Sequence, residues 1–198
     1  MALPVPFVLG SGSPRRKFLL EGLGLSFDIV VSDVDETPMQ GELPEPHCLR
    51  LAQSKAEAVA ALRPESLTLG ADTAVIVDGA ILGKPTDPDD AHRMLRMISG
   101  RWHTVITAYA LVCPDRGISV SKAVHSDVFI RELSDAQIRW YIATGEPMDK
   151  AGSYAIQDIG ASLVAKVNGS YTCVVGLPLA EVVGELETLF GPDCLLGE

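Results

Sequence analysis

Short apolar runs, polar turns and amphipathic segments alternate along the first third of this chain. Phe7-Val8-Leu9 is a strand-like run that enters a loop of small residues, and residues 15–23 then carry apolar side chains at helical spacing. The same pattern predicts a second strand over 27–31 and a helix over about 47–62. We therefore expect strands and helices to alternate in this part of the chain.

Hairpin signals dominate the middle and the end of the chain. Residues 67–82 contain two β-branched, apolar runs on either side of Asp78-Gly79, a dipeptide that suits tight turns. Two longer strands, 102–112 and 118–130, are predicted to pair as antiparallel neighbours. Asn168-Gly169 predicts a further hairpin turn.

Three more helices are predicted from their start signals and periodicity. Asp87 followed by Pro88 begins one of them, and Ser134 with Gln137 forms a capping box for a helix over 136–144. A closing helix spans about 178–190. Early alternation combined with later hairpins favours an α/β fold with a mixed sheet.

Length and composition fit one compact domain over residues 1–198. The chain is 47% hydrophobic, yet it contains no apolar stretch of the roughly 20 residues that a membrane-spanning helix needs. The N-terminal apolar run is too short for a signal-peptide core, so we expect a cytoplasmic protein without a membrane partner. The four cysteines are widely spaced and predict neither a zinc ribbon nor a disulfide framework.

The charge balance restricts the partners. A net charge of −10 repels a nucleic-acid backbone at long range, so we expect no nucleic-acid partner. An anionic substrate would then need a local basic pocket or a metal ion.

The loop at residues 10–16 is the first candidate for such a pocket. Ser13 suits the helix N-cap and Pro14 the first helical position, so backbone amides converge beside the guanidinium groups of Arg15 and Arg16. This combination suits phosphate groups. An ordinary capped helix with two solvated arginines explains the same residues equally well.

Acidic side chains provide a second candidate site. Asp72 lies in an apolar stretch, where a carboxylate is costly unless it is paired, bound to a metal ion or exposed at a cleft. Asp33, Asp35 and Glu36 lie in a loop, and their hard oxygen ligands suit Mg²⁺ or Mn²⁺ bound together with substrate phosphates. A structural Asp and an ordinary acidic surface loop are the alternatives.

Further polar residues could contact a nucleotide. Lys55 and Lys84 could neutralise phosphate oxygens, and Gln157 could hydrogen-bond a base edge through its amide. A packing role is favoured for His103. The chain contains no phosphate-binding P-loop motif, no H-E-x-x-H motif and no G-x-S-x-G motif, which argues against the corresponding enzyme classes.

Six ordered motifs resemble those of the Maf family, and the likeness covers about residues 7–190. They are Ser11-Gly12-Ser13-Pro14-Arg15-Arg16, Gly70-Ala71-Asp72-Thr73, Gly83-Lys84-Pro85, Ser99-Gly100-Arg101-Trp102-His103, the segment 149–157, and the segment from Gly169-Ser170-Tyr171 to Gly176-Leu177-Pro178. The resemblance implies an elongated Maf/ITPase-like α/β fold, in which a central mixed sheet separates two lobes around a nucleotide cleft. Homodimers are common in that family.

The resemblance also implies an activity. Ala71-Asp72-Thr73 and Ile156-Gln157 are similar to the branch that hydrolyses dTTP and UTP to the monophosphate and pyrophosphate, a house-cleaning reaction that uses a divalent metal cation. Asp72 matches the catalytic proton acceptor. Substrate contacts are implied for Ser13, Arg15, Arg16, Lys55, Thr73, Lys84 and Gln157, and metal contacts for Glu36 and Asp72.

Two departures and two alternatives stay open at this point. Asp158 stands where Gly is usual and Cys173 where Asn is common, and Asp158 adds negative charge near the expected base pocket. One alternative is a nucleotide-binding regulator of cell division or septum formation without significant turnover. The other keeps the chemistry but acts on modified pyrimidine nucleotides.

Overall fold

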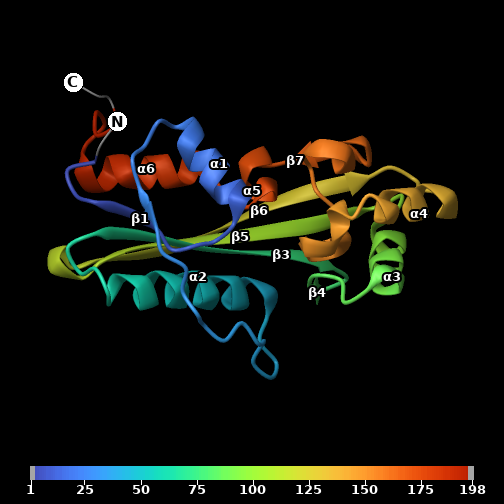
Figure 1. Ribbon diagram of the computed structural model, residues 1–198, viewed down its shortest axis with the longest axis horizontal. Coiled ribbons are helices and arrows are strands. Elements are labelled where there is room, and N and C mark those ends of the chain that lie inside the picture. The colour runs from blue at the N-terminus through green and yellow to red at the C-terminus, as the bar shows by residue number, and fades with distance from the viewer. Residues whose placement is uncertain (1–2, 196–198) are drawn as a thin grey trace. The chain divides into compact units, whose positions relative to one another are not determined.

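The computed structural model describes residues 3–195 as a mixed α/β structure (Figure 1). The strands are β1 (Phe7–Leu9), β2 (Asp28–Ile29), β3 (Leu67–Val77), β4 (Ala80–Leu82), β5 (Trp102–Cys113), β6 (Ile118–Ile130) and β7 (Val164–Asn168). The α-helices are α1 (Pro14–Gly22), α2 (Pro44–Ala60), α3 (Pro88–Ile98), α4 (Asp135–Ala143), α5 (Tyr171–Val175) and α6 (Leu179–Phe190). The 3₁₀-helices are η1 (Pro114–Arg116), η2 (Glu146–Asp149), η3 (Ala151–Ser153) and η4 (Asp158–Ser162).

The sheet is mixed, as predicted. Its strand order is β2-β1-β3-β5-β6-β7, and β4 pairs with β3. β1 runs parallel to both β2 and β3, whereas the β3–β4 and β6–β7 pairs are antiparallel. By its contacts the chain divides into two compact units. The first comprises Met1–Asp72, Thr107–Val124 and Gly176–Glu198, and the second comprises Thr73–Ile106 and His125–Val175.

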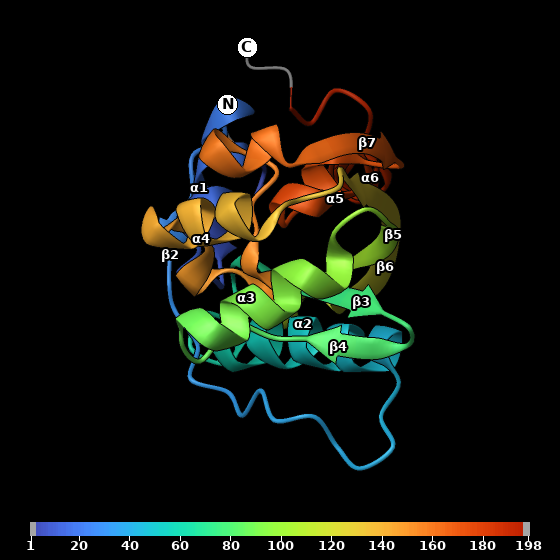
Figure 2. The ribbon, with the colours of Figure 1, turned by 90° about the vertical axis from the view of Figure 1, so that its right-hand side faces the viewer.

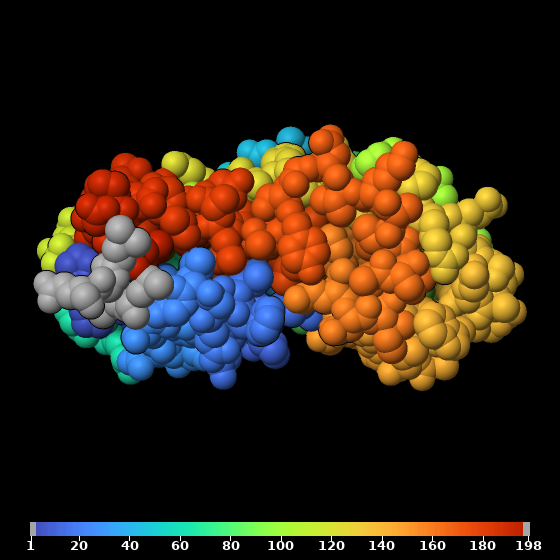
Figure 3. All heavy atoms as spheres, turned by 90° about the horizontal axis from the view of Figure 1, so that it is seen from above, coloured from blue at the N-terminus to red at the C-terminus, as the bar shows by residue number. Residues whose placement is uncertain are grey.

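The first unit places helices on both faces of its strands. α2 covers one face, and α1 and α6 cover the other (Figure 1). Seen from above, α1 in blue and α6 in red lie side by side (Figure 3). β1 is buried along its whole length, as expected of a parallel strand that is covered on both faces.

The second unit packs around one apolar cluster. Met94, Leu95 and Ile98 of α3 join Ile138 and Tyr141 of α4 in this cluster, together with side chains from the strands. The end of the unit that carries β4, α3 and α4 faces the viewer in Figure 2. Among the described residues, none of the helices combines the length and apolar character that crossing a membrane requires.

Local sequence signals placed several elements correctly. The Asp87 side chain accepts a hydrogen bond from the Asp90 amide at the start of α3, and the predicted capping box of Ser134 and Gln137 is present at α4. Asp78 and Gly79 both adopt positive φ in the β3–β4 turn, which confirms that hairpin. The closing helix begins within one residue of the predicted position.

The hairpin turn predicted at Asn168-Gly169 is wrong. β7 ends at Asn168, and the chain then enters α5 at Tyr171 rather than a second strand. The Ser126 hydroxyl explains this path, because it accepts a hydrogen bond from the Ser170 amide (3.0 Å) and donates one to the Ser170 carbonyl (3.1 Å). These bonds satisfy backbone groups that a strand partner would otherwise have to satisfy.

α2 and β3 approach each other closely at Gly70. A Cβ atom at this position would lie 2.3 Å from the Ala52 carbonyl oxygen and 2.7 Å from the Ala56 amide nitrogen. Both neighbours are backbone atoms of a packed helix, so neither can move aside easily. A side chain at residue 70 would therefore push the helix away from the strand.

We expect the substitution Gly70→Ala to lower the free energy of unfolding by about 2 kcal/mol, a typical cost of overpacking. Urea denaturation followed by circular dichroism measures the effect. Gly184→Ala, inside α6, is the matched control, because a Cβ atom there would meet none of the described atoms within 4 Å. The control should raise the same free energy by roughly 0.5–1 kcal/mol, and a Gly70→Ala protein as stable as wild type would contradict the packing argument.

Candidate functional site

The loop between β1 and α1 forms one side of the candidate site in the first unit. The Gly10 amide donates to the Leu69 carbonyl (2.8 Å), which fixes the start of the loop against β3. The Ser11 hydroxyl is buried and accepts hydrogen bonds from the Ser13 amide (3.3 Å) and from Arg16 Nη1 (3.0 Å). Ser13 occupies the predicted N-cap position of α1, although its side chain makes no capping hydrogen bond among residues 3–195.

Arg16 is held in place from two directions. Besides its contact with Ser11, its Nε donates to the Gly176 carbonyl (2.8 Å). Burial lowers the pKa of the Arg16 guanidinium, and the neighbouring charge of Arg15 acts in the same direction. The carboxylates of Asp72 and Glu36 act in the opposite direction, so both lie within electrostatic reach of Arg16.

The N-terminus of α1 concentrates positive charge. The first turn of this helix contains no acidic residue, and it carries Arg15 and Arg16 instead. The helix dipole already contributes partial positive charge at this end, so two cations here are electrostatically unfavourable by themselves. An anion bound beside the turn would relieve this repulsion.

Lys55 joins two carboxylates at the centre of the site. Its Nζ lies 2.7 Å from Glu36 Oε1 and 2.8 Å from Asp72 Oδ1. Lys55 and Asp72 are each 9% exposed, whereas the Glu36 side chain is 60% exposed. A buried ion pair of this kind is costly to desolvate, and removing one partner leaves an uncompensated charge.

The periodicities of helix and strand explain why these groups meet. Gly70 and Asp72 are two residues apart on β3, so they face the same side of the strand. Ala52, Lys55 and Ala56 are three and four residues apart on α2, so they share the face that packs on Gly70. The close approach at Gly70 therefore directs the Lys55 ammonium toward Asp72.

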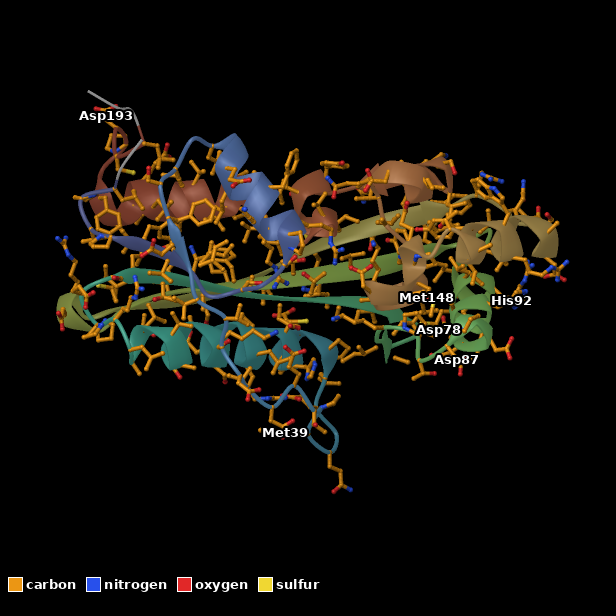
Figure 4. The ribbon with its side chains drawn as sticks, in the orientation of Figure 1. Met39, Asp78, Asp87, His92, Met148 and Asp193 are labelled. Atoms are coloured by element: carbon orange, nitrogen blue, oxygen red, sulfur yellow. The ribbon has the colours of Figure 1, made fainter. Side chains whose placement is uncertain are left out.

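The loop that carries Glu36 is tied to α2 by an ion pair that the sequence reading did not identify. Arg50 Nε and Nη2 donate to the Glu42 carboxylate (2.6 and 2.7 Å), and Nη2 also donates to the Thr37 carbonyl (3.2 Å). These hydrogen bonds with Arg50 hold the pKa of Glu42 well below its usual range. The Met39 amide donates to Glu42 as well (3.0 Å), and Figure 4 places Met39 in this loop on the α2 side of the unit.

The predicted substrate residues Thr73, Lys84 and Gln157 belong to the second unit. Thr73 and Gln157 are half-buried, and Lys84 is exposed. The backbone before Lys84 is fixed, because the Gly83 carbonyl accepts a hydrogen bond from the Gly152 amide (3.0 Å). Figure 4 labels Asp78 and Asp87, which lie before and after this Gly83–Pro85 turn in the chain.

Asp158 adopts a left-handed conformation directly after Gln157. Its φ is +51°, a value that glycine adopts without steric cost and that Asp tolerates better than most residues. The positive φ explains why the resemblance to the Maf family leads us to expect Gly at position 158. Asp158 therefore fits the turn, and its exposed carboxylate adds a charge beside Gln157.

His103 has the packing role that was favoured for it. The side chain is 4% exposed, and its Nε2 lies 2.7 Å from the Tyr154 hydroxyl, with the two rings in an edge-to-face arrangement. Burial lowers the pKa of His103 to about 4, so the ring is neutral near pH 7. Its Nδ1 has no hydrogen-bond partner within the part of the chain that the structure describes.

The donor set of the first unit fits a hard divalent cation that is shared with a substrate. Glu36 and Asp72 bring carboxylate oxygens to one point beside Lys55. Within residues 3–195, no three His, Cys, Asp or Glu side chains gather into a ready-made metal site. Mg²⁺ commonly binds through one or two carboxylates, with substrate phosphates and water as the remaining ligands, and two converging carboxylates are compatible with that mode.

The structure thus brings Glu36, Lys55 and Asp72 together, with Arg16 close enough to interact electrostatically. Ser11 and the Arg50–Glu42 pair support this arrangement. Ser11 lay within a recognised motif, but only its burial and its contacts distinguish it from Ser13. No sequence spacing indicated the Arg50–Glu42 pair, since its members are eight positions apart and the seven residues between them include the end of a loop and the start of α2.

Comparison with known proteins gives close relatives. A protein of Geobacter sp. (strain M21) named dTTP/UTP pyrophosphatase is 50% identical over 182 residues, which are 92% of this chain and 94% of that protein. Proteins with the same name from Syntrophus aciditrophicus and Syntrophotalea carbinolica are 45% and 51% identical, and they are covered to 89% and 84%. Among solved structures, the Staphylococcus aureus Ham1 protein is 15% identical, with a TM-score of 0.46 over 80% of this chain and 79% of that one.

A family profile covers most of the chain as well. The profile described as Maf-like protein matches residues 6–189. This range contains the loop before α1, the Glu36–Lys55–Asp72 cluster and the segment around Gln157. Together with relatives of about 50% identity over nine-tenths of the sequence, the match shows that this chain belongs to the Maf family.

Proposed function

We propose that this protein is a nucleoside triphosphate pyrophosphatase that hydrolyses dTTP and UTP to the monophosphate and pyrophosphate. The observation that carries the proposal is the Lys55 ammonium held between the carboxylates of Glu36 and Asp72. Relatives of about 50% identity bear the name of this activity. The substrates would be free dTTP and UTP in the cytoplasm.

Binding of the triphosphate would rest on local positive charge. The protein as a whole carries a net charge of −10, so a nucleotide must be attracted by a specific patch rather than by the overall field. Ser13, Arg15 and Arg16 at the start of α1 would contact phosphate oxygens, and Lys55 and Lys84 would add two point charges. Charge-assisted hydrogen bonds of this kind position the phosphate chain and stabilise charge that develops in the transition state.

Asp72 would act on the attacking water. A water oxygen forms a bond to the α-phosphorus, the bond from that phosphorus to the α,β-bridging oxygen breaks, and pyrophosphate leaves. The Asp72 carboxylate orients this water and accepts its proton, so no covalent intermediate is needed. Lys55 holds the carboxylate in place through the 2.8 Å contact. The rate then comes mainly from positioning and electrostatics.

A divalent cation, Mg²⁺ or Mn²⁺, completes the proposal. Glu36 and Asp72 would hold it together with phosphate oxygens, and it would supply neutralisation of phosphate charge. The Arg50–Glu42 pair serves this site indirectly, because it fixes the loop from which Glu36 extends.

Base selection is assigned to Thr73 and Gln157. An amide offers a donor and an acceptor to the edge of a pyrimidine, and a site built from such groups rejects bases that leave them unpaired. Modified pyrimidines that keep the same edge are expected to be accepted as well.

The first test is pyrophosphate release from dTTP, UTP, CTP, ATP and GTP. With Mg²⁺ we expect turnover to favour dTTP and UTP, and we expect a chelator to abolish it because phosphate charge is then left uncompensated. Adding Mg²⁺ back should restore activity. Tight nucleotide binding without release of pyrophosphate from any of the five would contradict the proposal and support a regulator without turnover.

We expect Asp72→Asn to lower kcat for dTTP about 10²- to 10⁴-fold, the usual contribution of a positioned general base. The amide keeps the size of the side chain but accepts a proton poorly. Asp28→Asn is the matched control, because it also removes the carboxylate of an ion pair, here with Arg63 at an exposed site of the same unit. Normal turnover by a folded Asp72→Asn protein would remove Asp72 from the mechanism.

We expect Gln157→Ala to reduce the preference for dTTP over CTP about tenfold in kcat/KM, as expected for the loss of one or two hydrogen bonds to the base. Both values are measured on one preparation, so the fraction of folded protein cancels from their ratio. Gln53→Ala serves as the control, because this glutamine bonds Glu57 and Ser119 in the first unit. An unchanged ratio in Gln157→Ala would show that another group reads the base.

A further inference from the structure

Three backbone amides in the segment from Ala155 to Gly160 donate hydrogen bonds to side chains. This segment lies outside every strand, and its only helical element is the 3₁₀-helix η4. Backbone amides at partly buried positions need partners, because an unsatisfied amide away from water is costly. Here the amides of Ala155, Ile159 and Gly160 find their partners in the side chains of two residues that lie earlier in the chain.

Glu146 satisfies the amides after Gln157. Its Oε2 accepts from the Ile159 amide (3.1 Å), and its Oε1 accepts from the Gly160 amide (2.8 Å). Glu146 lies in η2. Lys150 Nζ donates a hydrogen bond to the Glu146 carbonyl (2.7 Å), which helps to fix the backbone of this 3₁₀-helix. Figure 4 labels Met148 in this 3₁₀-helix. The Glu146 carboxylate thus binds the two backbone amides that directly follow Gln157 and Asp158 in the sequence.

Tyr141 satisfies the amide before Gln157. Its hydroxyl accepts from the Ala155 amide (3.1 Å) and donates to Glu146 Oε1 (2.8 Å). The side chain is fully buried. Burial and the adjacent Glu146 carboxylate raise the pKa of Tyr141, so the hydroxyl keeps the proton that it donates to Glu146.

The two ends of the segment are also in direct contact. A Cβ atom at Gly160 would lie 2.4 Å from the Ala155 carbonyl oxygen and 2.6 Å from the Tyr141 hydroxyl. Residues 155 and 160 therefore close a tight loop around Gln157, and the left-handed Asp158 makes the turn. None of these hydrogen bonds involves the side-chain amide of Gln157. They fix the backbone on both sides of Gln157 and leave its side chain to other partners.

We propose that Tyr141 and Glu146 form a clamp that positions Gln157 and thereby determines base selectivity. The proposal rests on the proposed function, in which Gln157 reads the pyrimidine edge. Tyr141 and Glu146 are positioning residues, because they act through the backbone of residues 155–160. A side chain whose backbone is fixed loses less conformational freedom when it binds. A misplaced Gln157 would leave its hydrogen-bonding groups unpaired with the preferred base, which weakens discrimination between bases.

Tyr141→Phe and Glu146→Gln test the clamp separately. Tyr141→Phe leaves the Ala155 amide without its acceptor. Glu146→Gln replaces one of the two accepting carboxylate oxygens with an NH₂ group, which donates hydrogen bonds and cannot accept them. We expect each variant to reduce the dTTP over CTP ratio of kcat/KM about fivefold to tenfold. The KM for dTTP should rise, and kcat should stay within about twofold of wild type, because the phosphate-binding and water-orienting residues are unchanged.

The ratio separates positioning from stability. A purely structural defect reduces the amount of folded enzyme and leaves the ratio of two substrates on one preparation unchanged. Tyr109→Phe is the matched control, since Tyr109 is also fully buried and its hydroxyl bonds the Glu181 carbonyl in the first unit (3.2 Å). We expect this control to keep the wild-type ratio. Should Tyr141→Phe fail to fold, the half-buried Glu146→Gln variant carries the same test.

A double-mutant cycle identifies the residue through which the clamp acts. In the background of Gln157→Ala, Tyr141→Phe should cause no further loss of selectivity, because the group that it positions is gone. An additive loss would overturn the proposal. The proposal would also be overturned if the wild type prefers dTTP and the clamp variants show the same preference. A wild type without any base preference would instead overturn the proposed base selection itself.

Discussion

The close approach of α2 to β3 at Gly70 is the contact on which the candidate site depends. The absence of a side chain there allows the backbone of Ala52 and Ala56 to reach the strand. Lys55 lies on the same face of the helix, and Asp72 lies on the same face of the strand. Their 2.8 Å ion pair follows from this packing. A larger residue at position 70 would separate the two elements and leave two partly desolvated charges apart.

Charge in the first unit is arranged in a way that suits a bound polyphosphate. Arg15 and Arg16 occupy the end of α1 where the helix dipole disfavours cations, and burial lowers the pKa of Arg16. Two carboxylates, on Glu36 and Asp72, offset part of this positive charge through Lys55 and Arg16. The negative net charge of the protein makes such a local concentration of cations more significant. An anion with several oxygens, together with a divalent cation, would match both signs of charge.

The second unit satisfies its irregular backbone in a different way. Side chains rather than strand partners accept the amides of the segment around Gln157, and Tyr141 links this segment to the apolar cluster. Burial gives such hydrogen bonds more weight, because water cannot replace them. The same unit uses Ser126 in an equivalent role at Ser170. Polar side chains thus define the path of the chain where regular secondary structure is absent.

The sequence by itself determined the elements that depend on near neighbours. The capped starts of α3 and α4, the Asp78-Gly79 hairpin and the closing helix all follow from residues within a few positions of one another. The ordered motifs also indicated the family, and the resemblance implied roles for Glu36, Lys55 and Asp72, but not their mutual contacts. Asn168-Gly169 was misleading, because a dipeptide that permits positive φ does not specify whether a strand or a helix follows. The pairings of Lys55 with Asp72, of Arg50 with Glu42 and of Tyr141 with Ala155 were decided only by the tertiary structure. Each of them joins side chains or backbone groups whose distance depends on how whole elements pack, and no local periodicity encodes that distance.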